Sequence, residues 1–300
     1  MKNLLVIFLL TIFSYQLSAQ SFYNRRIERQ WIGSFGTGVA KYFGDMANPG
    51  EIFKNPKWNL EAGIERRFDG RFSARVGLTA FQLKGGDQFA DDEGRKNRNL
   101  SFTTTAFELS ASGIVQLFED GARYYQRKPL NAFLSAGLGA LYYIPKGLST
   151  TKYHDGSPNP SAGKMVPLRA LQTEQVKYSP VTVVIPIGLG VKIMATPFLN
   201  ITVSGTYRFT FTDYLDDMST VYPGIDAFED PLAAAMSDKQ FELNGGVRPA
   251  GAIRGNSDKN DGYFMFSFRA DYFLPPNIFG AKSRGNAPKR TQYKNGRKRR

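Results

Sequence analysis

The sequence predicts an all-β fold: an eight-stranded antiparallel up-and-down transmembrane β-barrel with long outer loops and a disordered basic C-terminal tail. Three observations favour it. Apolar and polar residues alternate with a period of two, the alternating segments are long, and they follow an N-terminus with the composition of a secretion signal. Side chains of a β-strand point to the two faces of the sheet in turn, so each segment has one apolar and one polar face.

The N-terminus is predicted to be a signal peptide over residues 1–20. Lys2 supplies the positive charge, residues 4–13 are apolar, and Ala19 offers a small residue for cleavage before Gln20. The alternative is a membrane anchor, but a helix that spans a bilayer needs about 20 apolar residues, and this run is too short. The sequence therefore divides into the signal peptide, a barrel domain over 21–274 and a basic periplasmic tail over 275–300.

Eight segments have the expected strand pattern. Each is at least as long as the 9–11 or so residues of a tilted membrane strand, whereas strands of soluble sheets usually have about 5–6. The predicted strands are 31–43, 57–68, 71–84, 100–118, 130–144, 180–194, 199–212 and 262–273.

The polar faces of these strands carry charge. In the second segment Trp58, Leu60 and Ile64 share one face, and Glu61 and Glu65 share the other. A soluble sandwich would bury the apolar face, whereas a membrane barrel turns it toward lipid and encloses the polar one. Both signs of charge occur at the predicted inward positions, so we expect a lumen crosslinked by ion pairs and no open pore. These positions are Glu61, Glu65, Arg67, Arg75, Glu108, Arg208, Arg269 and Asp271.

Short and long connections alternate along the chain. The short ones, at 69–70, 119–129 and 195–198, follow the second, fourth and sixth strands. The long ones, at 44–56, 85–99, 145–179 and 213–261, follow the other strands. Outer-membrane barrels have short periplasmic turns and long outer loops, which predicts an outer-membrane location with both termini in the periplasm. Pro186 interrupts the sixth strand, where we expect a bulge or the end of the embedded part.

Three groups of polar residues are candidate sites. His154, the only histidine, could serve a loop-borne hydrolase or acyltransferase, but its surroundings have the composition of a polar turn. Asp213, Asp216 and Asp217 could bind calcium, although their spacing favours turn capping through their own backbone amides. The region 87–98 has the composition of a solvated loop tip. We therefore predict no catalytic residue, no cofactor and no metal site.

Composition narrows the possible functions. The chain has 300 residues and no cysteine, which excludes disulfides, thiolate metal sites and a cysteine nucleophile. Nine of the 13 net positive charges lie in residues 275–300, so the basicity belongs to the tail. The tail is either a solvated end, a docking segment for an acidic periplasmic protein, or a segment that binds anionic lipid or cell-wall polymer. Because the chain is predicted to be exported, we do not expect nucleic acid as its partner.

Two short motifs resemble the signatures of the PorG-like outer-membrane barrels of Bacteroidetes. They are Tyr42-Phe43-Gly44-Asp45-Met46 after the first strand and Thr212-Asp213-Tyr214-Leu215-Asp216-Asp217-Met218-Ser219 after the seventh. The similarity extends from Arg25-Arg26-Ile27-Glu28 to Phe273. The resemblance implies a component of the type IX secretion and gliding machinery that anchors a periplasmic ring complex to the outer membrane.

Two functions from different classes follow. The first is a non-enzymatic anchor whose partners are outer-membrane lipid and periplasmic secretion-ring proteins. The second is a surface binding or adhesion protein that acts through the loops 145–179 and 213–261. The partner-binding residues expected for the anchor are Arg25, Arg26 and Arg29 at the entry to the barrel, and Lys289, Arg290, Arg297, Lys298, Arg299 and Arg300 in the tail.

Overall fold

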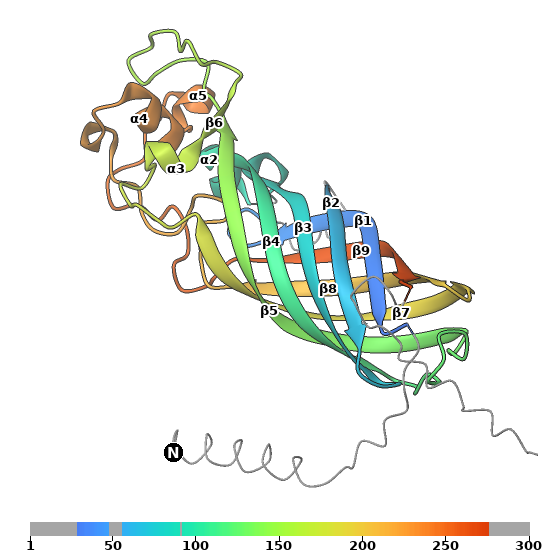
Figure 1. Cartoon of the computed structure of the whole chain (residues 1–300). Helices are drawn as coiled ribbons and strands as arrows, with labels where there is room; N and C mark the ends of the chain where they lie inside the picture. Colours follow the sequence, from blue (N-terminus) through green and yellow to red (C-terminus); the bar gives the residue numbers. More distant parts are fainter. Residues whose placement is uncertain (1–28, 48–55, 91, 276–300) are drawn as a thin grey trace, which may run out of the picture.

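The structure, a computed structural model, describes residues 29–47, 56–90 and 92–275. Within these residues eight long strands form a closed antiparallel barrel (Figure 1). Each strand pairs with the next along the chain, and β1 pairs with β9 to close the ring. The barrel strands are β1 (Trp31–Phe43), β2 (Lys57–Arg67), β3 (Phe72–Gly86), β4 (Ser101–Gln116), β5 (Leu130–Leu148), β7 (Val181–Thr196), β8 (Leu199–Thr210) and β9 (Gly262–Phe273).

All eight predicted strands are confirmed, and the first and last have the predicted bounds. β5 extends four residues beyond its predicted end. That extension pairs with a further short strand, β6 (Met165–Pro167), which was not predicted. A three-residue strand carries too little periodicity to be recognised, and it forms because β5 projects beyond the barrel with a free edge.

The outer face of the barrel is an apolar belt. Leu78, Leu138 and Leu189, on three different strands, are 62%, 62% and 64% exposed. Trp58, Leu60 and other outward residues of the alternation are exposed as well, while the charged residues between them are buried. Soluble proteins rarely expose an apolar surface of this extent. A closed ring of strands with apolar residues outside and ionised residues inside is the arrangement of a transmembrane β-barrel.

The interior has two parts. Toward the short connections, carboxylates and cations pair within the lumen: Glu61 with Arg75 and Arg269, Glu65 with Lys192, and Glu108 with Arg208. Among these groups lies a residual cavity of about 40 Å³, enough for a water molecule or so. The prediction of an interior crosslinked by ion pairs is therefore confirmed.

Toward the long connections, the interior is an apolar core. Phe81, Leu83, Phe102 and Tyr143 line the barrel wall there, and Leu215 and Met218 enter from the β8–β9 connection. The Leu215 carbonyl accepts a hydrogen bond from Thr104 Oγ1 on β4, at 2.5 Å. The long connection thus closes the mouth of the barrel from above.

The β5–β7 and β8–β9 connections fold together beyond this mouth, and we call residues 149–180 and 211–261 the cap. Figure 1 shows its helices gathered at the end of the barrel opposite the short turns. They are α3 (Leu168–Leu171), η2 (Ile225–Ala227), α4 (Pro231–Ser237) and α5 (Phe241–Asn244); η1 (Asp87–Phe89) and α2 (Glu93–Arg98) belong to the β3–β4 connection. In the described ranges, no helix has the length and apolar character needed to cross a bilayer.

The prediction of a bulge at Pro186 is wrong. β7 continues through this residue, which is paired with Arg208 of β8 without a shift of register. On the other side, the pairing of β5 with β7 omits two positions, between Ala136↔Ile187 and Gly139↔Val184, and then resumes in the same register. Proline has no N–H to donate, so the ladder opens locally on one side of the strand without a bulge.

Candidate functional site

The two sequence motifs at 42–46 and 212–219 meet at the capped mouth. The Tyr42 hydroxyl, at the end of β1, lies 2.7 Å from Asp216 Oδ2 and 2.6 Å from Asp261 Oδ1. A tyrosine hydroxyl has one proton, which can be donated to only one of these carboxylates. The other contact therefore needs a proton on a carboxyl group, and the three side chains form one proton-sharing group.

Further acidic residues surround this group. Burial raises the pKa of Asp213 to about 8, and the neighbouring Asp261 adds to the effect. Burial likewise raises the pKa of Asp261 to about 7 and holds that of Asp216 well above its usual range. The Asp213 Oδ2 atom is buried without a hydrogen-bond partner. Across the described residues, no group of three or more acidic or histidine side chains has an arrangement that could hold a metal ion.

The prediction that the aspartates of 212–219 cap their own turn is correct only for Asp216, whose Oδ1 accepts from the Met218 backbone N–H at 3.0 Å. Asp217 accepts hydrogen bonds from Thr173 Oγ1 and the Tyr178 hydroxyl, both at 2.5 Å. These donors lie about 40 residues away on the other cap segment. Asp217 therefore joins the two halves of the cap, a role that local spacing cannot reveal.

A buried ion pair lies beside Asp217. Arg254 donates to Glu174 Oε1 at 2.8 Å and to the Asp217 carbonyl at 2.6 Å. Glu174 also accepts from the backbone N–H groups of Ser219 and Thr220, each at 3.0 Å. Arg254 and Glu174 are both buried, so these bonds are made away from water and hold the cap in one arrangement.

The prediction of a solvated loop tip at 87–98 is correct for Asp92, Glu93 and Lys96, which are exposed, and wrong for Asp87 and Arg98. Asp87 is fully buried, and it accepts two hydrogen bonds from Arg98, at 2.7 and 2.6 Å. Asp92 caps α2 by accepting from the Arg95 backbone N–H. Asp91 lies outside the described residues. The two helical turns place Arg98 over Asp87, a pairing that the sequence alone did not indicate.

His154 is held within the cap. Its Nε2 lies 3.2 Å from the Ala234 carbonyl oxygen, and its ring centroid lies 4.1 Å from that of Phe241. Its Nδ1 is buried and has no hydrogen-bond partner. Nucleophilic catalysis needs a serine within hydrogen-bond reach of the imidazole. Ser157 instead bonds to Asp155, so this geometry supplies no catalytic pair.

At the opposite end, Arg29 joins the entry and exit of the barrel. Its Nη1 donates to the Phe273 carbonyl at 3.0 Å, and its guanidinium lies over the rings of Tyr124 and Phe198, 4.8 and 4.5 Å from their centroids. These rings belong to two short connections. Arg29, the first described residue, therefore lies beside the last residues of β9.

The sequence did not indicate the role of two arginines that lie at the end of the barrel with the short connections. Arg127 donates to the carbonyl oxygens of Pro197 and Thr196, at 2.9 and 3.1 Å, and so joins two short connections. Arg67 was predicted only as an inward charge; its Nη2 lies 3.4 Å from the Gly121 carbonyl. Both guanidiniums lie over the Phe273 ring. Both residues lie in or beside predicted short turns, and this position could have indicated their role.

The remaining predicted partner-binding residues, Arg25, Arg26, Lys289, Arg290, Arg297, Lys298, Arg299 and Arg300, lie outside the described residues, as do the signal peptide and the tail from residue 276 onward. Arg29 is the one member of that set that the described ranges include.

Neither a protein-family model nor a curated protein matches the chain. Among solved structures it is similar to Neisserial surface protein A, with 10% identity and a TM-score of 0.40 over 82% of this chain and 97% of that one. It is also similar to Ail, the attachment invasion locus protein of Yersinia pestis, with 10% identity and a TM-score of 0.37 over 81% and 96%. The outer-membrane enzyme PagL matches with 12% identity and a TM-score of 0.31 over 81% and 99%. These likenesses concern the fold and carry no inference about activity.

The class of protein is therefore defined by the barrel itself. The chain is an eight-stranded antiparallel transmembrane β-barrel of the outer-membrane type, with a filled lumen and a folded cap over one mouth.

Proposed function

We propose that this chain is a non-enzymatic outer-membrane barrel that anchors a periplasmic ring complex of the type IX secretion and gliding machinery. The short connections and both termini face the periplasm in this proposal. The observation that carries it is the contact between Arg29 and the Phe273 carbonyl. Arg29 and the end of β9 therefore lie side by side on a membrane-fixed barrel. In this proposal the basic segments that continue from these two points bind one partner.

The filled lumen supports an anchoring role over a transport role. Eight strands enclose little more than their own side chains, and here ion pairs occupy one part of the interior and apolar side chains the other. A solute would have to displace both layers and the cap. The barrel therefore offers a rigid support, and its function lies in what its ends bind.

The test uses the full-length protein in its native envelope. Deletion of residues 281–300 is expected to leave barrel assembly intact and to reduce the recovery of the periplasmic partner after crosslinking. A matched control replaces the tail lysines and arginines with glutamine at constant length, which separates charge from chain length. Equal partner recovery from the wild type and both variants would remove the tail from the proposed mechanism.

A second candidate is a surface binding protein that acts through the cap. The observation that favours it is an exposed apolar pair: Val221 and Ile253 face each other in an isolated bridge and are 43% and 82% exposed. Replacing both with serine should abolish surface adhesion while secretion persists if the cap is the functional element. Unchanged adhesion and unchanged secretion in this variant would exclude the exposed pair as a binding site and would favour the anchor instead.

A further inference from the structure

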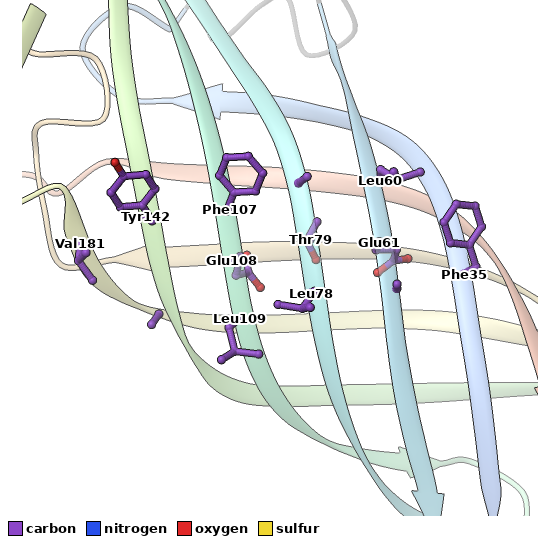
Figure 2. Close-up of a pocket in the computed structure, with 13 residues that line it drawn as sticks. Phe35, Leu60, Glu61, Leu78, Thr79, Phe107, Glu108, Leu109, Tyr142 and Val181 are labelled. Carbon is purple, nitrogen blue, oxygen red and sulfur yellow. The ribbon is translucent and has the colours of Figure 1, made fainter. Parts of the chain in front are cut away.

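The apolar belt is hollowed on the side formed by β1 to β5. A groove of about 430 Å³ lies there, bounded by the outward side chains of Phe35, Leu60, Leu78, Phe107, Leu109 and Tyr142. Figure 2 shows these residues around the groove, on neighbouring strands. The volume lies within the range of about 300–1,000 Å³ that is typical of small-molecule sites.

The groove exists because two of the outward positions are alanines. Ala80 of β3 is paired with Leu60 on one side and with Phe107 on the other. Ala62 of β2 is likewise paired with Phe35 and Leu78. Each alanine thus lies between two bulky side chains of the same face, and the missing side-chain volume leaves a channel that an acyl chain can fill.

A row of cationic and hydroxyl side chains lies on the same strands toward the cap. The register pairs Lys84 of β3 with Thr103 of β4, and Thr103 with Lys146 of β5. All three share the alternation phase of Ala80, Phe107 and Tyr142, so they belong to the outward face. The row lies four residues above the groove, about 13 Å along the strands, a distance that long lysine side chains shorten.

The two lysines are available for a ligand. Lys146 is exposed and Lys84 is partly exposed, and neither takes part in a salt bridge with another described residue. They are two strands apart, about 10 Å between backbones, so both ammonium groups can converge on one phosphate. Two cations at the edge of an apolar belt are matched to an anionic lipid headgroup.

A polar pocket of about 120 Å³ lies one step further toward the cap. Ser101 and Leu148 line it, and each lies two residues further toward the cap than Thr103 on β4 and Lys146 on β5, where the β4–β5 pairing ends. Gln88, Asn99 and Ser149 contribute amide and hydroxyl groups, and Glu242 is engaged by the Thr151 N–H and hydroxyl, at 2.6 and 2.8 Å. The volume is that of about four waters, which suits a few hydroxyl groups of a sugar.

We propose that the outer face of β3, β4 and β5 binds one phosphorylated glycolipid of the outer leaflet. An acyl chain lies in the groove, a phosphate lies between Lys84 and Lys146, and sugar hydroxyls reach the polar pocket. The three features follow one another along β4 and β5 in the order acyl, phosphate and sugar. A phospholipid such as phosphatidylglycerol would use the groove and the lysines but leave the pocket without a ligand.

The inference is independent of the secretion role. It uses the barrel, its register and the side chains of one face, and only the assignment to the outer leaflet shares the orientation assumed in the proposed function. It is tested on purified protein without any periplasmic partner. Failure of the anchor proposal would not affect the lipid-binding proposal, and failure of the lipid-binding proposal would not affect the anchor proposal.

The experiment measures lipid binding to the full-length barrel in detergent by native mass spectrometry, with lipid A, phosphatidylglycerol and phosphatidylethanolamine as probes. The wild type is expected to retain one lipid A and to prefer it over phosphatidylglycerol. The double variant Lys84→Gln/Lys146→Gln should bind lipid A more weakly, by a factor on the order of 30 for two lysines. Ala80→Phe, which fills the groove, should also reduce binding.

Two control variants make the same types of substitution at positions outside the proposed lipid site. Lys152→Gln/Lys177→Gln removes two exposed cap lysines, and Ala270→Phe adds the same ring to the outward face of β9. Both should bind lipid A as the wild type does. Equal affinity of the wild type for lipid A and phosphatidylglycerol would overturn the proposal, as would unchanged lipid A binding in the lysine variant. The wild-type comparison needs no variant to fold.

Discussion

Lys192 of β7 and Glu65 of β2 meet inside the barrel, where the lysine Nζ lies 2.7 Å from the glutamate Oε1. Their strands are not neighbours in the ring, since β1, β9 and β8 separate them on one side. The ion pair therefore crosses the lumen and joins opposite walls. Ser73 Oγ adds a second hydrogen bond to the same carboxylate oxygen, at 2.7 Å.

Breaking this pair should destabilise the barrel strongly. Lys192→Met leaves the Glu65 carboxylate buried without its cation, and we expect a loss of about 3–5 kcal/mol. The measurement is urea unfolding of the barrel in lipid vesicles. The double variant Glu65→Gln/Lys192→Met removes both charges and should recover much of this loss. A double variant as unstable as Lys192→Met would contradict a cross-lumen pair.

The lipid face is tested by an added cation. Phe266 of β9 is outward and exposed, and Phe266→Arg should destabilise the barrel by about 2–4 kcal/mol near the bilayer midplane. Thr182→Arg should have a smaller effect, because Thr182 has the inward phase of β7, lies at the capped end of that strand and is only partly buried. Vesicle unfolding of the two variants provides the comparison. The opposite order would mean that the faces have been assigned the wrong way round.

The stability of the cap should depend on pH. The folded-state pKa values of Asp261 and Asp213, about 7 and about 8, exceed those of aspartates in an unfolded chain, about 4. The folded cap therefore binds more protons than the unfolded cap between these limits, and its stability falls as the pH rises through this window. Lys239, whose pKa burial lowers to about 8, acts only above this range.

Hydrogen exchange measures this effect. After correction for intrinsic exchange rates, the cap segment 211–261 should be protected at least about tenfold more at pH 5 than at pH 8. Asp216→Asn removes one acidic member of the proton-sharing group and should flatten the dependence. Equal protection at both pH values in the wild type would show that these carboxyl groups do not control the cap.

The cap should also depend on Arg254. Arg254→Met leaves the buried Glu174 carboxylate without the cation that lies 2.8 Å away. We expect local unfolding of the cap, with a destabilisation of about 3–5 kcal/mol, and an intact barrel. Limited proteolysis should then cut within 149–180 or 211–261 while the strands stay protected. Arg248→Met, at a more exposed cap arginine, serves as the control.

The sequence by itself determined the strands, their faces and the phase of the connections. An alternation of period two is a local property, so the apolar side of Trp58, Leu60 and Ile64 can be recognised without knowledge of the fold. The inward charges, Glu65 and Arg269 among them, follow from the same alternation.

Only the tertiary structure decided which of these groups meet. Glu65 and Lys192 are 127 residues apart, and their contact depends on closure of the ring. The same is true of Asp217, which joins two cap segments, of Asp87 beneath Arg98, and of Lys84 and Lys146, which the strand register aligns. Pairing between distant segments is set by register, closure and the folding of long connections, and none of these leaves a periodic signal in the chain.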